Sequence, residues 1–373
     1  MINRYLESII ASRMGQGKAI VLFGARQVGK TTMLKNLLAR RDDVLWLNGD
    51  EQDVRNLFEN VSSTMLKTII GKKSVVVIDE AQRISDIGIG IKLITDNIPD
   101  VQVLATGSSS FDLSNKINEP LTGRKMEYWM YPLSFGELVE HHGLLEEKRL
   151  LAHRLIYGSY PDVINNVGDE RMILTELANS YLYKDILMFD KIKKSDKLVK
   201  LLQALAFQMG SEVSYNELAQ TCGLDPKTVE SYVTLLEQSY IIFRLGSFSR
   251  NLRNELKFAR KIYFWDCGIR NAVIGNYQML ESRLDTGALF ENYMVAERLK
   301  KLRYEKSYAK SYFWRSKLRQ EIDYIEEMDG QLAAVEFKWN PNRKAAMPLS
   351  FSRSYPDVDF KVVTRDNFET FLL

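Results

Sequence analysis

Runs of hydrophobic residues alternate with helical stretches over the first third of the chain. The apolar runs are 19-AIVLF-23, 44-VLWLN-48, 74-SVVVIDE-80, 101-VQVLATG-107 and 126-MEYWMY-131. Helical stretches are predicted at 2–13, 30–40 and 61–70. Strands with near-continuous Val, Ile and Leu, alternating with helices, are typical of a parallel sheet covered on both faces. The pattern therefore predicts an α/β domain over residues 1–140.

The middle of the chain has a helical pattern instead. Helices are predicted over 146–158, 169–190 and 196–208, so we expect a helical lid or linker over residues 141–210. Residues 211–246 then have the texture of a helix-turn-helix, within a winged-helix domain that we expect over residues 211–265. Ser214 and Glu217 form a capping box before the helix 215–222, and Asp225-Pro226 begins the helix 226–239. The strand 240–245 follows, which is the order of a winged helix.

Toward the C-terminus the pattern returns to α/β. A long helix near 288–302 precedes the strands 311–315, 321–326 and 331–339. These elements predict a separate α/β domain over residues 266–373.

Composition limits the class of protein only broadly. The 373 residues carry a formal net charge of +3, so composition alone does not indicate a nucleic-acid partner. Only two cysteines occur, which excludes a disulfide framework and suits a reducing compartment. The charged N-terminal stretch has no signal-peptide core, and no apolar run approaches the roughly 20 residues that cross a bilayer. We expect a soluble, cytoplasmic protein without a membrane partner. The three histidines have no zinc-ligand spacing with the cysteines.

Residues 24–31 carry the most specific chemical signal. The sequence GARQVGKT fits GxxxxGK[ST] and lies between a hydrophobic strand and a helix, as that motif requires. Glycines permit a tight loop whose N–H groups point at phosphate oxygens, and the helix adds its positive end. Lys30 would contact the β- and γ-phosphates, and Thr31 would reach Mg²⁺. The predicted ATP-binding residues are Gly24, Gln27, Val28, Gly29, Lys30, Thr31 and Thr32.

Two acids end the apolar run 74–78. Asp79 and Glu80 follow a strand whose C-terminal end should meet the same sheet edge as the phosphate loop. We expect Asp79 to hold Mg²⁺ through water and Glu80 to orient and deprotonate the attacking water. The presence of Glu80 favours hydrolysis over binding alone.

Hydroxyl side chains follow the strand 101–105. A polar group at that strand end could sense the γ-phosphate or position the water. The candidates are Thr106, Ser108, Ser109 and Ser110, with Ser108 taken as the catalytic prediction and Thr106 left as its rival.

Together these motifs resemble those of AAA+ type P-loop ATPases, and more closely a bacterial and archaeal family of ATPases with a C-terminal domain of unknown function. The residues that carry the resemblance are GARQVGKTT (24–32), VVVIDEAQ (75–82), LATGSSS (104–110), LTGRKMEYWMYPLSFGEL (121–138), GSYPDV (158–163) and KIYFWDCGIR (261–270). The resemblance implies that the strand 101–106 is inserted between the phosphate-loop strand and the Asp-Glu strand. It also implies that Arg124 is an arginine finger for a neighbouring subunit, which would require a homo-oligomer.

The region after the second helix of the helix-turn-helix is basic. Its charges are Arg244, Arg250, Arg253, Lys257, Arg260 and Lys261, opposed only by Glu255. Phosphate contacts supply much of nucleic-acid affinity, so this segment is a candidate DNA-binding surface, with Arg250, Arg253 and Lys257 as its central residues. A solvated face, or a winged helix used as an ATPase lid, is the alternative.

The C-terminal domain carries an acidic pattern. Glu291 on a helix, Asp323 in a strand and the Glu336-Phe-Lys338 triplet on the next strand make up the PD-(D/E)XK nuclease pattern. Asp323 and Glu336 would hold a divalent metal, and Lys338 would polarise the water or the phosphate. If Ile325 pairs with Leu332, the two acids share a face, and a one-residue slip would separate them. The resemblance implies a nuclease-like fold here, although not necessarily an active one.

The sequence thus favours an ATP-driven machine or switch that acts on DNA. An ATP-gated, metal-dependent nuclease and a nucleotide-controlled scaffold with an inactive nuclease fold remain the alternatives.

Overall fold

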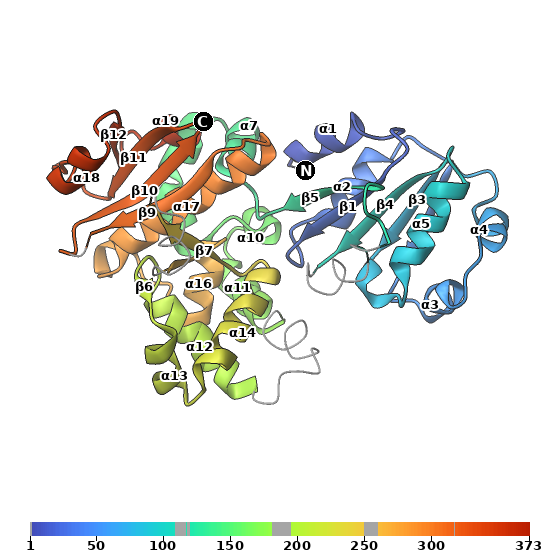
Figure 1. Ribbon diagram of the computed structural model, residues 1–373, viewed down its shortest axis with the longest axis horizontal. Coiled ribbons are helices and arrows are strands. Elements are labelled where there is room, and N and C mark those ends of the chain that lie inside the picture. The colour runs from blue at the N-terminus through green and yellow to red at the C-terminus, as the bar shows by residue number, and fades with distance from the viewer. Residues whose placement is uncertain (1, 109–116, 118–119, 181–194, 250–259, 317) are drawn as a thin grey trace. The chain divides into compact units, whose positions relative to one another are not determined.

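The computed structural model describes residues 2–108, 117, 120–180, 195–249, 260–316 and 318–373 (Figure 1). The chain divides into two compact units. One comprises residues 1–132 with Gln238–Tyr240, and the other comprises Leu133–Glu237 with Ile241–Leu373. Among the helices of the described residues, none combines the length and the apolar character needed to span a bilayer.

A five-stranded parallel sheet forms the centre of the first unit (Figure 1). Its strand order is β2-β3-β4-β1-β5, and all neighbours run parallel. The strands are β1 (Ala19–Gly24), β2 (Val44–Asn48), β3 (Val75–Asp79), β4 (Gln102–Gly107) and β5 (Lys125–Met130). Because β4 lies between β1 and β3, the predicted insertion of this strand is confirmed.

Every residue of β1 and β4 is buried, as the continuous apolar runs predict for strands covered on both faces. The described helices of this unit are α1 (Tyr5–Ala11), α2 (Lys30–Leu37), α3 (Gln52–Phe58), α4 (Ser63–Ile70), α5 (Ile87–Asn97) and the 3-10 turn η1 (Ala81–Arg83). Helix α3 was not predicted, because its polar stretch buries only Val54 and Phe58 and shows little apolar periodicity.

The second unit begins with a series of short helices. They are α7 (Phe135–His142), α8 (Leu144–Arg149), α9 (Leu151–Tyr157), α10 (Pro161–Asn165) and α11 (Glu170–Ser180). A capping box between Ser134 and Glu137 begins α7. The single helix predicted over 146–158 is divided at Leu150 into α8 and α9.

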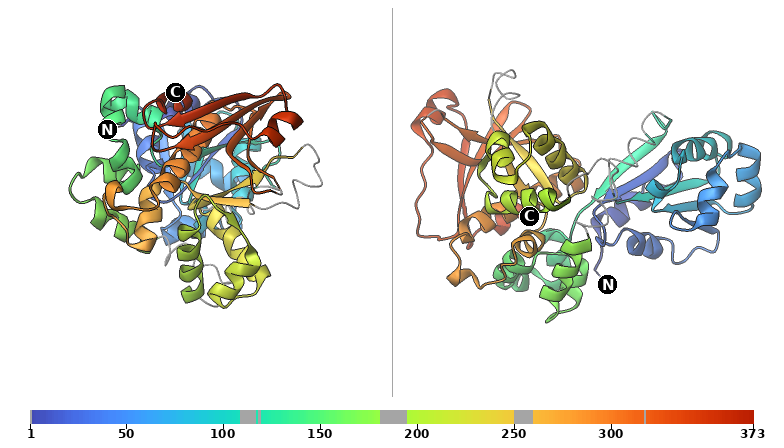
Figure 2. Two further views of the ribbon diagram at one scale, coloured as in Figure 1. Left: turned by 90° about the vertical axis from the view of Figure 1, so that its left-hand side faces the viewer. Right: turned by 90° about the horizontal axis from the view of Figure 1, so that it is seen from below.

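Three helices and three strands follow. They are α12 (Ser195–Phe207), β6 (Glu212–Val213), α13 (Tyr215–Cys222), α14 (Pro226–Gln238), β7 (Ile242–Ser247) and β8 (Arg260–Phe264). The predicted N-caps are confirmed, since Ser214 accepts a hydrogen bond from the Glu217 N–H and Asp225 accepts one from the Thr228 N–H. Helices α12 to α14 form one cluster in both views of Figure 2.

The rest of the unit completes a mixed seven-stranded sheet of order β12-β11-β10-β9-β7-β8-β6. Strand β7 joins β9 in parallel through two residue pairs, Gly246 with Tyr312 and Ser247 with Phe313. The remaining elements are α16 (Cys267–Ile274), η3 (Leu280–Ser282), α17 (Thr286–Tyr304), β9 (Lys310–Arg315), β10 (Glu321–Met328), β11 (Gln331–Lys338), α18 (Leu349–Ser354), β12 (Asp359–Thr364) and α19 (Glu369–Leu372).

The register predicted for the β10–β11 hairpin was wrong by two residues. Ile325 pairs with Ala334, and Met328 pairs with Gln331. The turn is therefore only Asp329-Gly330, and both residues have positive φ, at 52° and 83°. That geometry is a two-residue hairpin turn with the Asp-Gly preference of type I′. Because side chains alternate with a period of two, the shift leaves Asp323 and Glu336 on one face, as predicted.

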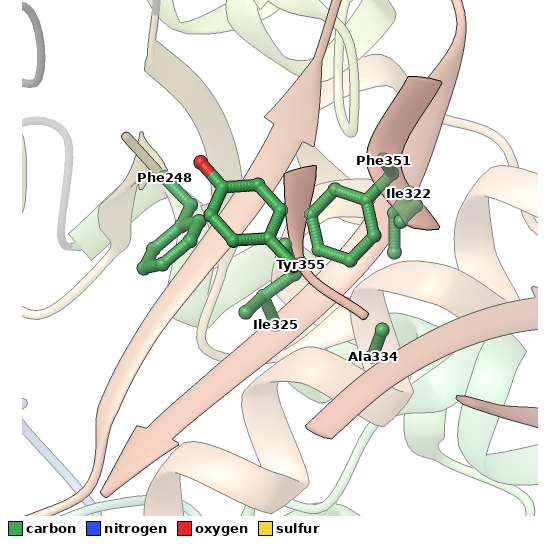
Figure 3. Packing of buried hydrophobic residues seen from close by; sticks show 6 residues of the cluster. All are labelled: Phe248, Ile322, Ile325, Ala334, Phe351 and Tyr355. Carbon is green, nitrogen blue, oxygen red and sulfur yellow. The ribbon is translucent and has the colours of Figure 1, made fainter. Parts of the chain in front are cut away.

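One face of this sheet carries a compact apolar cluster (Figure 3). The rings of Phe248 and Phe351 flank Tyr355, with centroid distances of 5.3 Å and 4.7 Å. They pack against Ile322, Ile325 and Ala334 from β10 and β11. This packing holds the residues after β7 on the C-terminal strands and so extends the short β7–β9 junction.

Candidate functional site

The phosphate loop is shaped by close backbone approach and positive φ angles. A Cβ atom at Gly24 would lie 2.2 Å from the Met130 carbonyl oxygen, so a larger residue would push the loop away from β5. Gly29 has φ of 94° and is the N-cap of α2, while Gln27 has φ of 56°. Val28 is fully buried under the loop, whereas Gln27 and Thr32 are exposed. The sequence therefore folds into a loop whose last residue begins a helix.

Lys30 lies at the first position of α2 and is 6% exposed. Its Nζ donates hydrogen bonds to the carbonyl oxygens of Gly24 and Ala25, each at 2.8 Å. The ammonium group is thus held across the mouth of the loop. A cation in this place is positioned for phosphate oxygens, which are stronger acceptors than carbonyl groups.

Asp79 joins hydroxyl groups from two other elements. Thr31 Oγ1 donates to Asp79 Oδ2 at 2.8 Å, and Thr106 Oγ1 donates to Asp79 Oδ1 at 2.5 Å. The carboxyl ends of β3 and β4 therefore meet the start of α2, as the sequence predicts. Hydroxyl and carboxylate oxygens are ligands that Mg²⁺ accepts, with phosphates and water completing its shell, so these residues fit that ion.

A hollow of about 550 Å³ opens beside this group. Thr31, Asp79, Asn48 and Glu51 contribute to its lining.

Glu80 is held in an unusual backbone conformation beside this group. Its φ and ψ are 50° and 41°, in the left-handed region that non-glycine residues rarely adopt. The Glu80 N–H donates to Thr106 Oγ1 at 3.1 Å. Gly49 contacts the same turn, since its N–H donates to the Asp79 carbonyl oxygen at 2.8 Å. A Cβ atom at Gly49 would lie 2.5 Å from the backbone carbonyl oxygen of Glu80. Backbone strain of this kind often occurs at functional sites.

Gln82 connects Glu80 to the end of β4. Its Nε2 donates to Glu80 Oε2 and, at 2.9 Å, to Ser108 Oγ. Both rival hydroxyls, Thr106 and Ser108, are therefore buried within the same cluster. Ser109 and Ser110 lie outside the described residues. Sequence reasoning did not single out Gln82, although its place two residues after Glu80 in the same motif was a signal.

Arg4 is a second residue that sequence reasoning missed. The side chain is 8% exposed, and its guanidinium donates to the carbonyl oxygens of Val28 and Tyr131, both at 2.6 Å. It thereby ties the phosphate loop to the residue that follows β5. Only its place at the start of an amphipathic stretch was visible in the sequence, and that pattern does not distinguish a buried arginine from a solvated one.

Arg124 lies away from this cluster within its own chain. It immediately precedes β5, and its Nε pairs with Asp96 at 2.6 Å. Strands β1 and β5 pair in parallel, with Ala19 opposite Lys125 and Gly24 opposite Met130. The phosphate loop follows the end of this pair at Gly24, whereas Arg124 precedes the end at Lys125. Six strand residues separate the two ends, or about 20 Å. Arg124 is therefore not brought into the site of its own chain.

At the C-terminal sheet, a buried lysine lies beside the carboxylates of Glu291 and Glu321. Lys261 Nζ lies 3.0 Å from Glu291 Oε1 and also pairs with Glu321. Tyr263 donates its hydroxyl to the same Glu291 oxygen at 2.6 Å. Burial raises the pKa of Glu291 to about 7, against the opposing effect of Lys261. Burial would lower the pKa of Lys261, but the carboxylates of Glu291, Glu321 and Asp323 outweigh it and raise that pKa.

The other members of the acidic pattern also have partners within the chain. Asp323 accepts a hydrogen bond from the Phe337 N–H at 2.9 Å, and burial, followed by the charge of Glu336, raises the pKa of Asp323 to about 6. Lys338 pairs with Glu336 at 2.5 Å. Within the described ranges, no three acids, histidines or cysteines come together as a metal site. The residues of the pattern therefore do not fit a divalent metal as they stand.

The predicted DNA-binding residues Arg250, Arg253 and Lys257 lie outside the described residues. Two flanking members of the basic segment are not part of an open basic surface, which corrects the prediction for them. Lys261 is 1% exposed and faces acids, because it points from β8 toward α17 and β10. Arg244 pairs with Glu237.

Comparison with known protein families finds matches to three successive parts of the chain. Residues 16–139 match the family described as "AAA domain", residues 148–279 match a "Domain of unknown function (DUF8612)", and residues 286–370 match a "Domain of unknown function (DUF4143)". The first of these matches, with the strand order of the parallel sheet, identifies the N-terminal part as a P-loop ATPase domain of AAA type. The C-terminal part is the DUF4143 domain.

Several relatives extend over most of the chain. An uncharacterised protein of Methanocaldococcus jannaschii, MJ1544, is 21% identical over 98% of this chain and 85% of its own length. An uncharacterised protein of Mycobacterium tuberculosis, Rv2008c, is 24% identical over 86% of this chain and 70% of its own length. Among solved structures, the Walker-type ATPase paby2304 of Pyrococcus abyssi is similar with a TM-score of 0.49 and 15% identity, over 74% of this chain and 96% of that one.

Proposed function

We propose that the chain binds ATP with Mg²⁺ at the phosphate loop and hydrolyses it. The observation that carries the proposal is the convergence of Lys30, Thr31 and Asp79 at one edge of the sheet. Lys30 would contact the β- and γ-phosphates, and Thr31 with Asp79 would hold Mg²⁺. The ion would neutralise charge that develops on the phosphates.

Glu80 supplies the base in this proposal. Its carboxylate is held by Gln82, which is in turn bonded to Ser108, so the side chain has a fixed direction. Thr106 holds the backbone of Glu80 and the carboxylate of Asp79 at once. A base fixed in this way can accept a proton from an attacking water. Arg124 would act only on a neighbouring copy, so we also propose that the active ATPase is a homo-oligomer.

We further propose that ATP turnover is coupled to DNA. In support, the order α12-β6-α13-α14-β7-β8, with β8 paired to both β6 and β7, is similar to the order of elements expected for a winged helix. The sequence segment that links β7 to β8 carries Arg250, Arg253 and Lys257. Cytoplasmic location remains a prediction, and the two free thiols, Cys222 and Cys267, suit it.

The scaffold alternative has one specific observation in its favour. Two acids of the nuclease-like pattern, Glu291 and Glu336, are paired with lysines of the chain itself, and the described residues contain no group of three acids, histidines or cysteines that could hold a metal. A domain of that kind would contact partners without cutting DNA.

Phosphate release from ATP should test the proposal directly. The chain should release phosphate from ATP when Mg²⁺ is present, and the release should stop when EDTA removes the ion. Single- or double-stranded DNA should make the release faster. Absence of Mg²⁺-dependent turnover under all these conditions would contradict the ATPase proposal. Normal turnover without any response to DNA would contradict only the coupling and leave the scaffold function.

Replacing Arg250 and Arg253 together by Ala should weaken DNA binding in a gel shift. Each lost phosphate contact should reduce the slope of log affinity against log salt by about 0.9. Arg343 and Lys344, two adjacent exposed cations, provide a matched pair for replacement with the same loss of charge. Equal weakening by the two pairs would show that net charge, and not the segment between β7 and β8, determines binding.

A further inference from the structure

The acidic centre of the C-terminal sheet already contains a cation that belongs to the chain. The Lys261 side chain is 1% exposed, and its ammonium lies between the carboxylates of Glu291 on α17 and Glu321 on β10. The ring of Phe313 covers it, with Nζ 5.4 Å from the ring centroid. An ammonium so deeply buried is stable only when carboxylates surround it.

The carboxylates of the pattern are each engaged by a donor of the protein. Oε1 of Glu291 accepts from both Lys261 and Tyr263, at 3.0 Å and 2.6 Å. Asp323 accepts from a backbone N–H of β11. Lys338, which would face phosphate or water in an active centre, is paired with Glu336. A divalent ion would have to displace the Lys261 ammonium to reach this group of acids, because two cations beside the same carboxylates would repel each other strongly.

The lysine also connects two halves of the seven-stranded sheet, one made of β6, β7 and β8 and the other of β9 to β12. Lys261 belongs to β8, whereas its acids belong to α17 and β10. Among the residues that the structure describes, strand pairing between these halves consists of Gly246 with Tyr312 and Ser247 with Phe313, next to which the Phe248 N–H donates to the Phe313 carbonyl. Arg315 of β9 adds a second connection of the same kind, since it pairs with Glu212 of β6 at 3.0 Å.

We propose that the Lys261 ammonium is the resident cation of this centre and takes the place that a divalent metal would have in a nuclease of this pattern. The centre then joins the β6–β8 strands to the C-terminal strands. It neither binds Mg²⁺ or Mn²⁺ nor cuts phosphodiester bonds.

Mn²⁺ binding by the full chain, followed through the electron paramagnetic resonance signal of free Mn²⁺ without nucleotide at pH 8, should test this proposal. The unaltered chain and Asp323→Asn should bind the same number of ions, since the phosphate-loop site is common to both. Neither should nick supercoiled plasmid with Mg²⁺ or Mn²⁺. An ion that the unaltered chain binds and Asp323→Asn does not bind would overturn the proposal.

Lys261→Met should create the missing site. Provided that circular dichroism and gel filtration show a folded chain, this variant should bind one Mn²⁺ more than the unaltered chain. The added ion should be lost again in Lys261→Met/Asp323→Asn. A folded Lys261→Met chain that gains no Mn²⁺ would also overturn the proposal. If the variant does not fold, the comparison of the unaltered chain with Asp323→Asn still decides it.

Discussion

A Glu80→Gln chain is expected to bind ATP with nearly the affinity of the unaltered chain and to hydrolyse it at least about 100-fold more slowly, the usual contribution of a general base. The amide keeps the size of the side chain and can still accept a hydrogen bond from Gln82. It cannot take up a proton from water. Steady-state phosphate release and equilibrium binding of a fluorescent ATP analogue measure the two effects separately.

Lys30→Ala provides the contrast to this variant. It removes the cation held over the loop by the carbonyl groups of Gly24 and Ala25, so both binding and turnover should fall. Glu59→Gln is the matched control for Glu80→Gln. It makes the same change from a carboxylate to an amide, at a side chain that is exposed at the end of α3. Normal turnover in Glu80→Gln would show that the base is another group. Loss of ATP binding in that variant would show that Glu80 has a structural role.

The parallel sheet was predictable because its signals are local. Strands β1, β3 and β4 are apolar on both faces, and the glycines and Lys30 stand at fixed offsets in the loop after β1. The meeting of Asp79 with Thr31 follows from a general property of parallel sheets, whose strands carry their C-terminal residues to one edge. Local pattern and topology were sufficient for this part of the site.

Contacts between segments far apart in the chain were not predictable in the same way. Arg4 reaches a carbonyl group 127 residues away, and no spacing rule connects them. Lys261 was counted with a basic surface because its sequence neighbours are basic. Its direction is set by strand β8, where alternation places Lys261 and Tyr263 together toward Glu291. A charge run in the sequence does not reveal which members turn inward.

The hairpin register shows a different kind of error. The Asp-Gly dipeptide at 329–330 is a strong local signal for a two-residue turn, and its use would have paired Met328 with Gln331 from the start. The prediction that the acids share a face held only because the shift was an even number of residues. What those acids contact then depended on Lys261, which comes from a strand about 60 residues earlier in the sequence.

Lys261→Met should destabilise the second unit by about 3–5 kcal/mol near pH 8, because the carboxylates of Glu291, Glu321 and Asp323 would lose their shared cation. The loss should shrink as the pH falls. The pKa values of Glu291 and Asp323 are raised by burial to about 7 and about 6, so in the folded chain these acids take up protons at a higher pH than in the unfolded chain. A raised carboxyl pKa means a contribution to stability that is present at low pH and lost as the pH rises through the folded value.

Without the ammonium these pKa values should rise further, and protonation near pH 5 should remove most of the penalty. Urea unfolding at pH 8 and pH 5, with hydrogen exchange of peptides from β8 and β10, would measure the difference between the variant and the unaltered chain at each pH.

Lys310→Met at the exposed start of β9 is the control and should change stability by less than about 0.5 kcal/mol. In the double variant Lys261→Met/Glu291→Gln the pH 8 penalty should be smaller, because one uncompensated charge is gone while the Tyr263 hydroxyl keeps an acceptor. A penalty that is independent of pH and unaffected by Glu291→Gln would instead indicate lost packing against Phe313, and the ammonium would then have no electrostatic role in joining the sheet.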